Sequence, residues 1–280
     1  MSNQLNITGT RSVPALNGWH WINEGVRYFI GNKLTWMLSM FFVLFISIFL
    51  INFMPGAQLI LLFVFPFVAA GLSMACADME KGNKMKLQSL LSAFSHPNRM
   101  NLFRYGLLLL LLIIIAQMIA SIILGLMGVN FELISTELNA IKDNQDASIQ
   151  MIFDSPIMLR FFVVTVITML PIVMINLLAP IILAFSSLTA WQSVKLSFIA
   201  GIKNIGAFAL YAAIYAAVLF VVVLVLNFIM QLLFSLLGEN SLLAVYLYLF
   251  IFVMIVLSLV SVSYSSAYVA FKDLFLGEEI

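Results

Sequence analysis

The segment that decides the fold reads LLLLLLIIIA (residues 107–116). It is the centre of a longer apolar stretch, Tyr105–Val129, in which apolar and polar residues do not alternate. A strand of a membrane barrel would show such alternation. A helix needs about 20 apolar residues to cross a bilayer core of roughly 30 Å. The stretch therefore predicts a membrane-spanning helix.

Five further stretches of similar length are equally apolar, so we expect an all-α integral membrane protein with a six-helix transmembrane bundle. The six expected spans are residues 34–54, 57–77, 105–129, 161–185, 205–237 and 242–271. Pro55–Gly56 separates the first two spans and Gly238–Ser241 separates the last two, both with turn-forming composition. We expect residues 1–33 to form an N-terminal tail with an interfacial helix, residues 34–271 one membrane domain, and residues 272–280 a tail.

The composition agrees with this assignment. Hydrophobic residues make up 64% of the 280 residues and charged residues 9%, and the mean hydropathy is +1.13. Soluble domains are about 45–50% apolar and about 25% charged, and such a fold could not bury this much apolar surface. The net charge of +1 gives no argument for a nucleic-acid partner. The polar start of the chain lacks the pattern of a secretory signal, so we expect the first span to be retained.

The placement of basic residues predicts the orientation. Eleven of the 13 lysines and arginines fall on one side of the six expected spans, and only Lys142 and Arg160 fall on the other. Basic residues mark the cytoplasmic side of membrane proteins. We therefore expect both termini in the cytoplasm and the protein in the bacterial inner membrane. The loop at 130–160 would then lie outside.

The residues before the first span predict an amphipathic helix. Apolar residues recur there at intervals of three and four: Leu16, Trp19, Ile22, Val26 and Phe29. Such a helix lies in the membrane interface, with tryptophan near the depth of the headgroups. We expect Trp19, Trp21, Arg27 and Phe29 to be its membrane anchors.

Similar stretches precede the third and the fifth span, and we call these three stretches elbows. The third contains Trp191, Lys195 and Lys203 as expected anchors, and each elbow ends with an asparagine beside a basic residue. The chain can then be divided into three units, each an elbow plus a helical hairpin, over residues 11–77, 84–185 and 188–271. The alternative is that the stretches share only the basic and aromatic composition common at cytoplasmic ends of membrane helices. Their basic residues suit anionic lipid headgroups.

Candidate catalytic groups are absent from the expected spans. A charged residue deep in the bilayer is costly and usually functional, and the centres of the six spans contain none. The two histidines are far apart in sequence, and Cys76 is the only cysteine. We therefore expect no catalytic residue, no cofactor and no metal site, and we do not expect an enzyme.

Neutral polar residues leave one candidate pathway. Asn176 lies between Pro171 and Pro180 in the fourth span. Prolines free backbone carbonyls that can coordinate a ligand. The alternative is that Asn176 only makes a hydrogen bond to a neighbouring helix.

Three blocks of the sequence resemble a family of uncharacterised multipass inner-membrane proteins of Gram-negative bacteria. The blocks read VPALNGWHWINEGVRYFIGNKLTW (residues 13–36), SMACADMEKGNK (73–84) and WQSVKLSFIAGIKN (191–204). The resemblance implies a helical inner-membrane protein without assigned activity, and it supplies no catalytic residues.

Three functions remain open. The first is a non-enzymatic component that organises or stabilises other membrane components, with a membrane-protein partner or a second copy as its neighbour. Rows of small residues such as Ala209–Ala213–Ala217 allow such helix contacts. The second is a transporter or channel for a lipid-like or small neutral solute. The third is an enzyme that acts on lipid headgroups through Asp78, Glu80 or His20.

Overall fold

The computed structural model describes residues 5, 7, 9–143, 154–238 and 241–277. Six helices in this part of the chain are long and apolar enough to cross a membrane, and none of its residues forms a strand. These helices are α2 (Lys33–Phe53), α3 (Ala57–Glu80), α4 (Arg99–Leu126), α7 (Pro156–Phe185), α9 (Ile205–Leu237) and α10 (Leu242–Phe271). A short π-helix, η2 (Lys272–Leu276), continues α10.

The expected spans agree with these helices, and the differences at their ends have local causes. Helix α4 begins at Arg99, whereas the expected span begins at residue 105. The expectation missed the first turns of the helix because they are too polar to count as part of a membrane span. It ends at Leu126, shortly before Gly128, whose φ of +75° breaks the helix. Helix α7 begins at Pro156, where the Ser155 side chain accepts a hydrogen bond from the Met158 amide.

Besides η2, four shorter helices accompany the six long ones in the described part of the chain. They are α1 (Asn17–Gly31), the 3₁₀ helix η1 (Leu87–Ser95), α5 (Phe131–Asp143) and α8 (Ala190–Lys203). We call α1, η1 and α8 the elbow elements, because they coincide with the three elbows. Residues 144–153 of the expected outer loop and residues 239–240 of the last turn lie outside the described residues.

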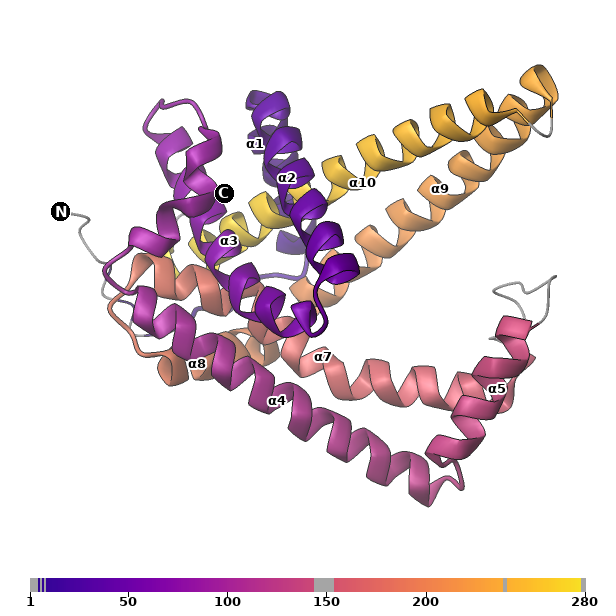
Figure 1. Cartoon of the computed structure of the whole chain (residues 1–280). Helices are drawn as coiled ribbons and strands as arrows, with labels where there is room; N and C mark the ends of the chain where they lie inside the picture. Colours follow the sequence, from indigo (N-terminus) through magenta and orange to yellow (C-terminus); the bar gives the residue numbers. More distant parts are fainter. Residues whose placement is uncertain (1–4, 6, 8, 144–153, 239–240, 278–280) are drawn as a thin grey trace.

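The six long helices form three hairpins of two helices each: α2–α3, α4–α7 and α9–α10. Their second helices, α3, α7 and α10, all contact one another and form the centre of the bundle. Helix α2 packs against α10 and α3, α4 against α7 and α3, and α9 against α1 and α10. Figure 1 shows the α4–α7 and α9–α10 hairpins diverging from the end of the molecule at which α8 lies.

Each elbow element packs chiefly on the second helix of a hairpin other than the one that it precedes. Element η1 precedes α4 but packs on α3, and α8 precedes α9 but packs on α7. Helix α1 precedes α2 and packs on α10. The elbow elements therefore join neighbouring hairpins, and α1 connects the start of the chain to its last long helix.

Small residues allow these contacts to be close. A Cβ atom at Gly25 of α1 would lie 2.2 Å from Ser266 Oγ of α10, and one at Gly71 of α3 would lie 2.5 Å from the Ser89 carbonyl oxygen of η1. Ser265 of α10 also donates to the Gly25 carbonyl over 2.9 Å. In a membrane, lipid tails are as apolar as large side chains, so burying such side chains between helices brings little gain. Glycine and serine at helix contacts instead let the two backbones approach closely.

Asparagines tie the elbow elements to the rest of the bundle. Asn32, Asn98 and Asn204 each occupy the position before the first residue of α2, α4 and α9 respectively. The Asn98 amide nitrogen lies 3.0–3.2 Å from the carbonyl oxygens of Leu183, Ser186 and Leu188. The Asn204 amide bonds Val13 N and Arg11 O, at 2.8 and 3.0 Å. Both side chains therefore satisfy backbone groups that a helix end or a loop would leave unpaired.

Candidate functional site

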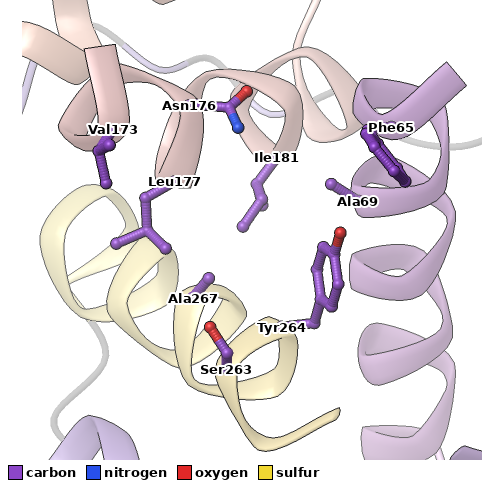
Figure 2. A pocket seen from close by; sticks show the side chains of 9 residues that line it. All are labelled: Phe65, Ala69, Val173, Asn176, Leu177, Ile181, Ser263, Tyr264 and Ala267. Atoms are coloured by element: carbon purple, nitrogen blue, oxygen red, sulfur yellow. The ribbon is translucent and has the colours of Figure 1, made fainter. Parts of the chain in front are cut away.

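A cavity of about 240 Å³ lies between the three second helices. Figure 2 shows α3, α7 and α10 surrounding it. Its lining residues are Phe65, Ala69, Val173, Asn176, Leu177, Ile181, Ser263, Tyr264 and Ala267. Phe65 and Val173 are 37% and 62% exposed, so the cavity is open to the surroundings between the helices.

Polar groups reach this cavity from two helices. The Asn176 side-chain oxygen accepts a hydrogen bond from the Tyr105 hydroxyl over 2.9 Å, which ties this side chain to α4. Its nitrogen, which Figure 2 shows on the cavity side, has no acceptor among the described residues. The Tyr264 hydroxyl also points into the space between α3 and α7 and has no partner in the described part of the chain. An amide donor and a hydroxyl are thus available to a ligand.

Pro180 changes the backbone hydrogen bonding next to the cavity. Because proline has no N–H, the backbone carbonyl four residues earlier, that of Asn176, loses its partner within the helix. Neither Pro180, which is buried, nor Pro171, which is exposed, lines the cavity itself. Of the three candidate pathway residues, the structure therefore places Asn176 at the cavity, and Pro180 acts on it through the backbone.

None of the described residues that line the cavity is charged. Five are aliphatic and one is phenylalanine, and the polar ones are an amide, a tyrosine and a serine. An ionic ligand would find no counter-charge there, and burial of an unpaired charge is costly. The lining therefore suits a neutral molecule that carries both polar and apolar groups.

The expected membrane anchors divide into two groups. Trp19 and Trp191 are 48% and 62% exposed, as an interfacial side chain would be. Lys195 is exposed, and Arg27 is exposed beside Glu24, to which it donates over 2.6 Å. These four are free to meet lipid.

The other anchors make contacts within the molecule. Phe29 packs against the core and Lys203 donates to the Thr10 carbonyl over 2.7 Å. Trp21 is fully buried, because its Nε1 donates to Asp273 over 2.8 Å and its ring packs against Phe208. Trp21 therefore lies in the core of the structure and not on its surface, where a membrane anchor would lie.

A buried carboxylate joins an N-terminal segment of the chain to a C-terminal one, and no sequence pattern predicts this contact. Asp273 of η2 is fully buried and pairs with the Arg11 guanidinium. It also accepts from the Asn17 side chain over 2.7 Å. A buried charge is stable only when paired and hydrogen-bonded, and Asp273 meets both conditions. The segment 272–280, which the sequence delimits as a tail, thus begins inside the core.

A second carboxylate, Glu80 at the end of α3, has three donors. The Tyr28 and Tyr268 hydroxyls and the Lys272 ammonium all bond to it. Burial and the adjacent Glu80 carboxylate raise the pKa of Tyr28 above its ordinary value. Glu80 joins α1, α3 and α10 at the elbow end, by which we mean the end of the bundle where the elbow elements lie. Because it holds these elements together, it has little freedom to act in catalysis.

The remaining candidates for headgroup chemistry do not come together around a reactive group. Asp78 faces Lys81 at 3.4 Å on the surface, and His20 belongs to a different surface hollow, beside Arg11 and Asp273. Within the described residues, no group of three or more His, Cys, Asp and Glu side chains could hold a metal ion.

Comparisons of the chain with protein-family models, with curated protein sequences and with solved structures find no match. The resemblance to Gram-negative inner-membrane proteins therefore depends on the sequence motifs alone.

Proposed function

We propose that the protein is a non-enzymatic transporter or channel for a lipid-like or small neutral solute. The observation that carries this proposal is the uncharged cavity between α3, α7 and α10, with the amide nitrogen of the exposed Asn176 facing it. Binding sites of transporters are commonly built where helices meet near the middle of the membrane, beside a helix that proline interrupts. The position of Asn176 and Pro180 fits that arrangement.

The proposal includes the cell membrane and the orientation. We place the protein in the inner membrane of a bacterium with both termini in the cytoplasm, because the elbow end collects most basic residues. On that side, the exposed Trp19, Trp191 and Lys195 would meet anionic lipid headgroups.

We further propose that the three hairpins with their elbows are repeats about an axis near the membrane normal. Three features support this: each elbow element packs on the second helix of another hairpin, the second helices meet at the centre, and an asparagine precedes each first helix. The cavity then lies where the three units meet, which is a common place for a transport site in proteins built from repeats.

The test is solute flux through the purified full chain in liposomes. Glycerol is a suitable neutral probe, and its entry is measured by the change in light scattering after rapid mixing. We expect the wild type to raise the rate of entry above that of empty liposomes. Two variants should reduce the increase at least about fivefold: Asn176→Leu, which removes the free amide, and Ala69→Phe, which fills the cavity.

Asn52→Leu is the matched control, because Asn52 is exposed on α2 and bonds only its own helix, at the Ile48 carbonyl. This control should keep the wild-type rate. A wild type that does not exceed empty liposomes, with glycerol and with monoacylglycerol alike, would contradict transport.

A second candidate function is the organisation of other membrane components, which the sequence analysis placed first. One observation favours it: Ala209, Ala213 and Ala217 form a row on α9 and are all exposed. A row of small residues allows a second helix to approach closely. Under this candidate, an Ala213→Cys variant should form a disulfide-linked pair in membranes under mild oxidation, since the native Cys76 is buried. A variant that stays monomeric would argue against a seam between two copies at α9.

A further inference from the structure

The central cavity has an apolar neighbour. A groove of about 130 Å³ lies between α2, α3 and η1. Phe42, Val43 and Ile46 of α2 form one wall, and Val64 and Val68 of α3 form the opposite one. Among the described residues that line it, Ser47 alone carries a hydroxyl, and this hydroxyl already donates to the Val43 carbonyl over 2.7 Å. The groove therefore offers a ligand apolar contacts and no free hydrogen-bonding group.

Phe65 belongs to both spaces. It lines the groove together with Val64 and Val68, and it lines the cavity together with Ala69. One aromatic ring on α3 thus stands between an apolar space and a space with a free amide and a hydroxyl. Phe65 is 37% exposed, so the ring is not locked in the core and can change rotamer without breaking a packed interface.

We propose that the ligand is a neutral single-chain amphiphile, with its uncharged polar head in the cavity and its hydrocarbon tail across Phe65 in the groove. This inference rests on the proposed function, because it names the class of solute that the cavity takes. The head meets the Asn176 amide nitrogen and the Tyr264 hydroxyl, and the tail meets apolar side chains and no free hydrogen-bonding group. A ligand with both parts uses both spaces, whereas a small polar solute would leave the groove empty.

The order of the two spaces also gives a route. Groove residues Phe42 and Ile46 are 41% and 51% exposed on α2, so the groove is open toward the surroundings of the bundle, which in a membrane are lipid tails. An amphiphile dissolved in the bilayer can insert its tail there first and bring its head to Asn176 past Phe65. Charged lipids are excluded, since the cavity supplies no counter-charge.

Binding of 1-monooleoylglycerol to the purified full chain tests this inference. Native mass spectrometry measures its apparent affinity, with oleate as the probe with the same tail and a charged head. We expect monooleoylglycerol to bind at least about tenfold more tightly than oleate. Equal affinities would overturn the claim that the head is neutral.

Two variants separate the parts of the site. Ser47→Phe fills the groove and should weaken monooleoylglycerol binding at least about tenfold while glycerol flux stays unchanged. Asn176→Leu should weaken both, and Asn52→Leu is the control for a lost amide on the bundle surface. If Ser47→Phe binds monooleoylglycerol like the wild type while Asn176→Leu does not, the groove is not the tail site, but the cavity is still the head site. If Asn176→Leu changes neither measurement, the proposed function itself fails.

A substitution can abolish binding by misfolding the protein, so the tail site is also tested by photo-cross-linking of the wild type. Monooleoylglycerol with a diazirine at the middle of the tail is photoactivated in the presence of the wild type. The cross-linked peptides should come from the three lining segments, 42–47, 61–68 and 90–94. Cross-links confined to other helices would overturn the assignment of the groove.

Discussion

Asp273 shows how single side chains close the molecule on itself. Its partner Arg11 is 262 positions away in the sequence, and Trp21 and Asn17 of α1 add their donors to the same carboxylate. No local pattern indicates such a pairing, because helical periodicity relates only residues three or four apart. Sequence analysis could therefore find Asn176, which prolines flank, but could not find Asp273.

Replacing Asp273 should destabilise the protein strongly. In Asp273→Ala the buried Trp21 donor and the half-buried Asn17 donor lose their acceptor and the Arg11 guanidinium loses this carboxylate, which we expect to cost about 3 kcal/mol in all. Thermal unfolding in detergent, followed by size-exclusion chromatography after heating, measures the shift. Asp78→Ala is the control, since Asp78 is exposed and its pair with Lys81 is worth at most about 1 kcal/mol. Equal midpoints for the two variants would contradict the role of Asp273.

His96 should make stability depend on pH. Burial lowers the pKa of His96 below its ordinary value, and its Nδ1 accepts from the Asn98 amide over 3.2 Å, which requires that nitrogen to be unprotonated. The unfolded chain therefore takes up a proton more readily than the folded one. The contribution of neutral His96 to the free energy of unfolding should be complete above about pH 6.5, the ordinary pKa of histidine. It should decrease as the pH drops below that value.

The His96→Gln variant isolates this effect. Melting midpoints at pH 7.5 and pH 5.5 should differ less in the variant than in the wild type, because glutamine does not titrate. An unchanged difference would mean that other groups cause the pH dependence.

At the scale of elements, the elbow elements differ from surface helices of soluble proteins. Helix α1 buries Gly18, Trp21 and Gly25 and leaves Leu16 and Trp19 exposed. Of the expected apolar face, Leu16 and Trp19 are exposed, Ile22 and Val26 are half-buried and Phe29 packs against the core. Two of the three fully buried positions of α1 are glycines. Periodicity alone locates the helix, but it does not tell which face is packed when the surroundings are themselves apolar.

The Gly25 contact can be tested with matched substitutions. In Gly25→Ala the new Cβ would lie 2.8 Å from the Ser266 backbone nitrogen as well as close to its hydroxyl, so α1 and α10 must separate. We expect a loss of about 1–3 kcal/mol, measured as a lower melting midpoint. Gly31→Ala, where no atom lies within 4 Å of the new Cβ, should be neutral or slightly stabilising because alanine favours a helix. A Gly25→Ala midpoint at or above that of Gly31→Ala would refute the contact.

Hydropathy along the sequence predicts where the long helices lie, but it does not predict how they pack against one another. The bounds of α9 and α10 agree with the expected spans 205–237 and 242–271. The central position of α3, α7 and α10 depends on which helix faces meet, and the long spans are apolar on every side, so their sequences do not mark a packed face. The cavity between them was therefore visible only in the structure.

We propose that six helices cross a membrane with all elbow elements on one side. Single cysteines in a Cys76→Ala background test it, labelled in intact cells with a thiol reagent that does not cross the inner membrane. Gln58, Glu132 and Leu242, next to the hairpin tips, should react when replaced by cysteine. Ser12, Asn83 and Ser187 at the elbow end should react only after the cells are opened. A tip position that stays protected in intact cells while Asn83 reacts would contradict the account.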